Sequence, residues 1–189
     1  MSTQHFTEDL ESKAWDAHRA FLVEAERSFG PRDDSYTVTD IVQEIHGPTL
    51  SLNGHSVTLV VGPNATKYFP ALIANVAHET LHTLNPVTGN ATMLEEGAAI
   101  YFELQIISSQ FSESERKYFW NHLPETYRTA FADFETLLGF DQNAGLTIRK
   151  EFGSLSDLDK NGLRKLFPEL QDDCASRLVT RQRMRPNAG

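Results

Sequence analysis

The stretch LIANVAHETLHTL, residues 72–84, carries the strongest structural signal in the chain. Its apolar residues recur at helical spacing, which predicts a central helix that starts between Thr66 and Pro70 and ends near residue 84. His78 and His82 lie one helical turn apart, so both imidazoles can face one metal ion. The glutamate between them, Glu79, can accept a proton from water without being a ligand. This pattern indicates a catalytic metal site rather than a structural one.

Three glutamates downstream are candidates for the third ligand: Glu95, Glu96 and Glu103. The run from Thr92 to Glu95 fits a helix-capping box, in which the Glu95 side chain points back to Thr92. The connection between the two predicted helices is short, so Glu96 should lie level with His82. Glu103 is two turns further along, roughly 10 Å deeper, where a hydrogen bond to a histidine is expected. We therefore predict Glu96 as the ligand.

Gly97 directly follows that ligand in the first turn of the second helix. Glycine costs a helix about 1 kcal/mol relative to alanine. A close approach of the two metal-site helices at this point would explain its presence.

The rest of the chain predicts a mostly helical α+β fold in one domain, residues 1–189. Residues 7–29 predict an amphipathic helix, in which His18 is expected to be solvated. Residues 36–62 are rich in β-branched side chains and predict about three strands, with Asn53-Gly54 as a tight turn. Two parts are expected: residues 1–110 with the first helix, the sheet and the metal-site helices, and residues 111–189 as a C-terminal helical part.

The composition argues against several functions. The formal net charge is −9, so neither nucleic acid nor an anionic membrane is expected as a partner. Cys174 is the only cysteine, which rules out an intramolecular disulfide; we expect it to be a small core residue. Residues 1–11 do not resemble a secretory signal, and no apolar stretch approaches the roughly 20 residues that cross a bilayer. These features favour a cytoplasmic protein and leave its oligomeric state open.

The segments VAHETLH and LEEGAAIYFE, residues 76–82 and 94–103, carry a family resemblance. They resemble the two motif helices of the gluzincin zinc metallopeptidases, in particular the M1 aminopeptidase-like branch. In that branch a Glu-Gly pair is followed by a small residue and then by Tyr and Glu, at the spacing of Tyr101 and Glu103. The resemblance implies a zincin-like fold, a zinc cofactor, a peptide or protein substrate and Glu96 as the third ligand.

The chain also departs from that branch. The gap from His82 to Glu96 is shorter than in the large aminopeptidases, and their exopeptidase recognition motif is missing. The stretch Val61–Ala65 is instead predicted as the edge strand with which gluzincins hold an extended substrate. Its Asn64 and Ala65 are similar to the thermolysin-type edge and are our substrate-binding candidates. The metzincin class is excluded, because its extended motif has no counterpart in residues 85–88.

The resemblance implies hydrolysis of a peptide bond by a zinc-activated water, with Glu79 as general base. A further donor should stabilise the oxyanion, and the candidates are Tyr127, His122 and Tyr101. We select Tyr127, which lies downstream of the ligand as the aminopeptidase tyrosine does. Two alternatives stay open: a metal-binding module without proteolytic activity, and a helical scaffold without metal.

Overall fold

The protein is described here by a computed structural model that covers residues 7–45 and 47–181. It is a mostly helical α+β fold with a small sheet, as predicted. Within the described residues, no helix is both long enough and apolar enough to cross a membrane. The elements in chain order are α1 (Glu8–Phe29), β1 (Thr37–Gln43), β2 (Thr49–Asn53), β3 (Ser56–Val61), α2 (Phe69–His82), α3 (Met93–Gln110), α4 (Glu113–His122), α5 (Glu125–Phe140), α6 (Ala144–Phe152), α7 (Lys160–Leu166) and α8 (Asp172–Leu178).

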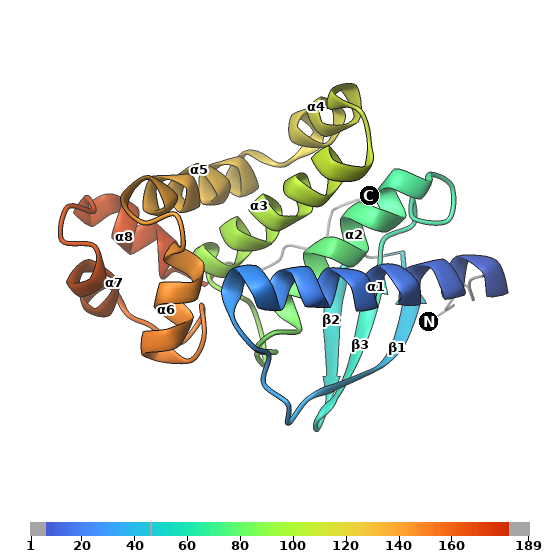
Figure 1. Cartoon of the computed structure of the whole chain (residues 1–189), viewed down its shortest axis with the longest axis horizontal. Helices are drawn as coiled ribbons and strands as arrows, with labels where there is room; N and C mark the ends of the chain where they lie inside the picture. The colour runs from blue at the N-terminus through green and yellow to red at the C-terminus, as the bar shows by residue number, and fades with distance from the viewer. Residues whose placement is uncertain (1–6, 46, 182–189) are drawn as a thin grey trace.

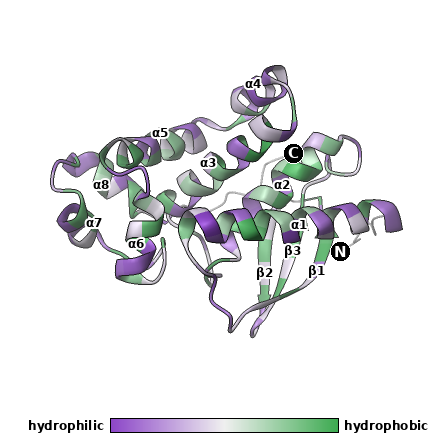
Figure 2. Cartoon of the chain, in the orientation of Figure 1, coloured by the Kyte–Doolittle hydropathy of each residue, from purple (hydrophilic) through white to green (hydrophobic). Residues whose placement is uncertain are grey.

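Helices α2 and α3 form the centre of the molecule, with the sheet on one side and α5 on the other (Figure 1). Leu72 and Leu81 on α2, and Leu94 and Ile100 on α3, are 2% exposed or less. The prediction of a central helix is therefore confirmed. Figure 2 shows hydrophobic residues on the strands and α2, whereas α4 is mostly hydrophilic. Cys174 is buried in the core, also as predicted.

The position of β3 in the sheet differs from the prediction. Strand β3 lies in the middle of the sheet, parallel to β1 and antiparallel to β2, in the order β1-β3-β2. The prediction that Val61–Ala65 is an edge strand is therefore wrong, because Val61 ends the central strand β3. The reason is visible in Leu59-Val60-Val61, three consecutive apolar residues that are all 2% exposed or less. A strand with both faces buried belongs in the interior of a sheet.

The hairpin between β2 and β3 is present where the sequence predicted it. Asn53 pairs with Ser56, so the two-residue loop is Gly54-His55 rather than Asn53-Gly54. Gly54 adopts a φ of 61°, which favours glycine at this turn position.

Gly97 is needed for a different contact from the one expected. A Cβ atom at this position would lie 2.3 Å from the carbonyl oxygen of Ala130, on α5. The glycine thus allows α3 to approach α5, not α2. This crossing brings the first turn of α3 close to the first two turns of α5, and so brings Glu96 and Tyr127 to one region of the fold.

His18 is buried rather than solvated. It is only 4% exposed, and its Nδ1 is hydrogen bonded to the hydroxyl of Thr80 on α2 at 2.9 Å. Burial, with smaller contributions from Arg32 and Arg19, lowers the pKa of His18 to about 4. The packing of α1 on α2 therefore encloses a neutral imidazole.

This neutral imidazole should make stability depend on pH. The unfolded chain binds a proton at His18 near pH 6.5, and the folded protein only near pH 4. The contribution of His18 to the free energy of unfolding is therefore at its full value above pH 6.5 and decreases as the pH falls toward 4, where the folded protein also binds the proton. Between pH 7 and pH 5 we expect the free energy of unfolding to fall by about 2 kcal/mol through this residue. Urea unfolding of the wild type and His18→Gln at both pH values measures this loss, and equal losses in the two proteins would contradict it.

Candidate metal centre

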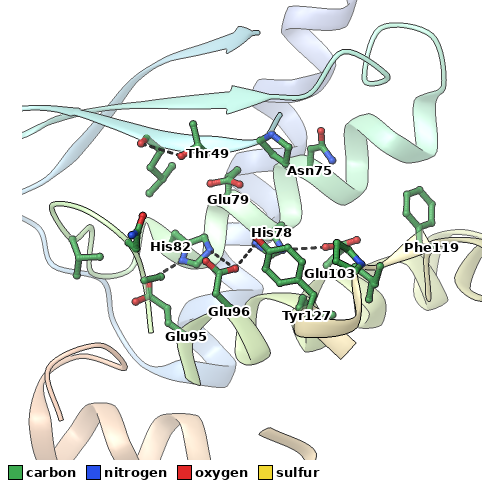
Figure 3. Close-up of a pocket in the computed structure, with 18 of the residues that line it drawn as sticks. Thr49, Asn75, His78, Glu79, His82, Glu95, Glu96, Glu103, Phe119 and Tyr127 are labelled. Carbon is green, nitrogen blue, oxygen red and sulfur yellow. Dashed lines mark hydrogen bonds and ion pairs between the residues drawn. The ribbon is translucent and has the colours of Figure 1, made fainter. Parts of the chain in front are cut away.

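His78, His82 and Glu96 come together at one point (Figure 3). The Nε2 atoms of His78 and His82 lie 3.3 and 3.8 Å from the same carboxylate oxygen of Glu96. One potential ligand atom from each residue lies within 4.8 Å of the other two. The sequence predicted this cluster from helical spacing and the short interhelical connection. A metal ion could be held by all three residues.

The local structure explains why Glu96 joins the two histidines. The i, i+4 spacing places both imidazoles on one face of α2, one of them in its last turn. Helix α3 begins after the N-cap residue Thr92, whose hydroxyl accepts a hydrogen bond from the backbone of Glu95 at 3.3 Å. Glu96 therefore lies in the first turn of α3, level with His82.

Two further carboxylates orient the histidines from behind. Glu103 is hydrogen bonded to Nδ1 of His78 at 3.1 Å, and Glu95 to Nδ1 of His82 at 2.8 Å. Each imidazole thus binds a carboxylate through Nδ1 and directs Nε2 toward Glu96. Carboxylates bound in this way fix the ring orientation of metal-binding histidines. The contact of Glu103 with a histidine was expected, and that of Glu95 was not.

Only half of the predicted capping box is formed. The Thr92 hydroxyl caps the helix, but the Glu95 side chain points to His82 instead of returning to Thr92. The backbone N–H of Thr92 donates to the hydroxyl of Ser156 at 3.2 Å, so it does not need the carboxylate. A buried carboxylate next to an imidazole gains a stronger, charge-assisted hydrogen bond. In the sequence, the only indication that Glu95 contacts a histidine is its position directly before the predicted ligand Glu96.

One atom of the cluster is well placed to bind a cation. Oε2 of Glu96 is buried, lies within ion-pairing distance of both imidazoles, and accepts no hydrogen bond among the described residues. A buried carboxylate oxygen is costly unless a positive charge or a donor compensates it, which protonated imidazoles do without metal and a bound cation would do in their place. Two imidazole nitrogens and one carboxylate oxygen form a donor set that suits Zn²⁺ and leaves a fourth position open. The residues present therefore fit a zinc ion.

The three residues line a cavity of about 390 Å³ between β2, α2 and the start of α5. Glu79 projects into the same cavity but lies outside the triad (Figure 3). Burial raises the pKa of Glu79 to about 7, although the nearby imidazoles partly oppose this. A carboxylate with a pKa near neutrality is suited to exchange protons.

In comparisons with protein families, known proteins and solved structures, nothing matches this chain.

Of the three candidate oxyanion donors, Tyr127 and His122 line the cavity. The ring of Tyr127 stands edge-on to that of His78, with centroids 6.4 Å apart. Burial and the surrounding carboxylates raise the pKa of Tyr127, so its phenol stays protonated and can donate. Tyr101 instead packs against Phe131 and Phe134 and does not line the cavity.

His122 is less suited to the role of donor. Its Nδ1 lies 2.7 Å from the carbonyl oxygen of Tyr118, which can only accept a hydrogen bond. Nδ1 must therefore carry the proton, and the neutral ring has a lone pair at Nε2. The neutral form cannot donate to an oxyanion from that atom.

The two substrate-binding candidates are not brought to the site. Asn64 is exposed and Ala65 is buried, and neither lines the cavity. They follow β3, which is covered by a strand on each side. The cavity is instead lined by Thr49 and Leu50 of β2, which is an edge strand. Sequence patterns do not show which of two paired strands lies at an edge next to a site.

Metal binding should displace protons from the two histidines. Burial alone would lower their pKa values, but the hydrogen-bonded carboxylates outweigh it. They raise the pKa of His82 to about 9 and that of His78 well above its ordinary value. We therefore expect both imidazoles to be protonated at pH 7 in the metal-free protein.

Zinc binding at pH 7 is therefore expected to release about two protons, because only neutral imidazoles bind the ion. At pH values below the histidine pKa values, each unit of increase in pH should raise the apparent zinc affinity about tenfold for each proton released. Calorimetry in buffers of different ionisation enthalpy measures the number of protons. His122→Gln, which leaves the triad intact, should release the same number. A binding enthalpy independent of the buffer would contradict the protonated state.

Proposed function

We propose that this chain is a zinc-dependent peptidase. The observation that carries the proposal is the convergence of a buried Glu96 oxygen with two oriented imidazoles, with Glu79 in the same open cavity. A structural zinc site has four protein ligands, whereas three ligands and an adjacent free carboxylate are typical of a hydrolase. The resemblance of the two motif segments to gluzincins supports the same reaction class.

A bound zinc ion would supply Lewis acidity toward a water molecule and the scissile carbonyl. Glu79 accepts the proton of the attacking water and delivers it to the leaving amine. The Tyr127 phenol donates a hydrogen bond to the oxyanion as it forms. Glu95 and Glu103 hold the two imidazoles in place throughout.

We further propose that β2 binds the substrate. As an edge strand, β2 has backbone N–H and C=O groups that are not paired within the sheet, and an extended peptide can pair with them. Thr49 and Leu50 belong to both this edge and the cavity wall. A peptide added to β2 would therefore pass over the catalytic residues. This assignment replaces Asn64 and Ala65.

The proposal is tested with purified protein and a mixed peptide library, analysed by mass spectrometry. We expect one zinc ion per chain, cleavage that stops when a chelator removes the metal, and recovery with one equivalent of zinc. Failure to bind zinc would refute the metal site. Zinc binding without any cleavage would instead assign the chain to the metal-binding, non-proteolytic class.

A further inference from the structure

Ser156 lies far from the metal centre in sequence but contacts it through one intermediate residue. It belongs to the loop between α6 and α7 and is 4% exposed. Its hydroxyl donates a short hydrogen bond to Oε2 of Glu95. The other carboxylate oxygen of Glu95, Oε1, is hydrogen bonded to His82 at 2.8 Å. A chain of contacts therefore runs from Ser156 through Glu95 to His82.

The donor direction in this chain follows from the chemistry of the groups. Ser156 accepts the backbone N–H of Thr92 at 3.2 Å, so its hydroxyl proton is available for the carboxylate. A hydroxyl has one proton to donate and can accept twice, and an ionised carboxylate only accepts. Both oxygens of Glu95 are thus used, one by Ser156 and one by His82. A carboxylate held at both oxygens cannot rotate away from the imidazole.

The loop that carries Ser156 is itself held on two sides. The backbone N–H of Ser156 donates to the Ser154 hydroxyl at 2.9 Å, and its carbonyl accepts from Arg181 at 2.8 Å. Arg181 also donates to the carbonyl oxygen of Asn90 at 2.8 Å, in the segment that precedes α3. The position of the serine hydroxyl relative to Glu95 is therefore well determined.

We propose that Ser156 is a positioning residue for the metal ligand His82 and acts through Glu95. The inference rests on the metal site of the proposed function but not on peptide hydrolysis. Without the hydroxyl, one buried oxygen of Glu95 loses its donor, and the carboxylate is free to leave His82. Outer hydrogen-bond partners of metal ligands contribute about 10- to 100-fold to metal affinity. For Ser156, one step further out, we expect about a tenfold loss, at the lower end of that range.

The test compares Ser156→Ala with Ser156→Thr, which keeps the hydroxyl. Zinc affinity is measured by chelator competition, and the ligand geometry by the visible absorption of the cobalt-substituted protein. We expect Ser156→Ala to bind zinc about tenfold more weakly with an altered cobalt spectrum. Ser156→Thr should recover affinity and spectrum. Unfolding of the metal-free proteins shows separately whether the loop has lost stability.

A double-mutant cycle separates positioning from a general effect on the fold. In a Glu95→Gln background, Ser156→Ala should add little, because the chain of contacts is already broken. In a Glu103→Gln background it should keep its full tenfold effect, because Glu103 holds the other histidine. Unchanged zinc affinity in Ser156→Ala, or equal losses in both backgrounds, would overturn the inference. A wild type that binds zinc but cleaves no peptide would refute only the proposed function, and one that binds no zinc would refute both.

Discussion

Glu79→Gln is expected to keep its zinc and lose peptide hydrolysis, with kcat lower by about 10²- to 10⁴-fold. Glutamine has nearly the same shape as glutamate, so it can occupy the same buried position. It cannot accept a proton from water at any working pH. Because Glu79 lies outside the triad of His78, His82 and Glu96, the metal ligands are untouched. Single-turnover rates and zinc stoichiometry, measured on the same preparation, check both halves of this expectation.

Two further variants serve as controls for this result. Glu151→Gln, at an exposed position that does not line the cavity, should change neither rate nor zinc content. Glu96→Gln should lose both, because it removes a ligand. If Glu79→Gln cleaved peptides as fast as the wild type, Glu79 would not be the general base.

Gly97→Ala is expected to destabilise the protein by about 3 kcal/mol, which is large for the addition of one methyl group. The new Cβ would lie 2.3 Å from the Ala130 carbonyl oxygen, 2.8 Å from its carbon and 3.0 Å from Cβ of Phe134. Two of these atoms belong to the backbone of α5, so no side-chain rotation relieves the contact. Alanine is also the better helix former, and this gain of about 1 kcal/mol is included in the estimate. Urea unfolding with and without zinc measures the change.

Gly139→Ala is the matched control. Gly139 lies near the end of α5, and a Cβ there would meet no atom within 4 Å. Here the helix propensity of alanine acts alone and should stabilise the protein by about 0.5–1 kcal/mol. The same substitution is thus expected to change protein stability in opposite directions on two adjoining helices. Equal effects at the two positions would show that the close crossing of α3 and α5 is not what requires Gly97.

The Gly97 crossing also has a consequence for catalysis. It holds α5 against the first turn of α3, and Tyr127 lies one turn before Ala130. If α5 moves outward in Gly97→Ala, Tyr127 should withdraw from the cavity. Zinc affinity in the surviving folded protein would then fall less than the rate of hydrolysis.

Local patterns in the sequence were sufficient to predict several elements. The N-terminal helix was expected over residues 7–29 and is observed over 8–29, and Thr92 was recognised as an N-cap. The clustering of His78, His82 and Glu96 also followed from short-range geometry. A helical repeat and a short connection leave few ways to arrange residues so close in sequence.

Predictions that depended on distant parts of the chain were less successful. The Glu95 side chain was assigned to the helix cap because its nearest partner in sequence is Thr92. Ser156, 61 residues after Glu95, accepts the hydrogen bond from the Thr92 backbone instead. The Glu95 side chain can therefore bind His82. The polar neighbours of His18 in the sequence predict a solvated side chain, yet packing of α1 against α2 buries it beside Thr80.

The sequence by itself determined the cluster of His78, His82 and Glu96 and the helices that carry it, because these depend on spacings of a few residues. Only the tertiary structure decided that β2 rather than β3 borders the cavity, and that Tyr127 rather than Tyr101 faces it. It also decided that Glu95 supports His82. These outcomes depend on which buried surfaces pack together, and that is set by the shape and burial of the whole chain rather than by any local pattern.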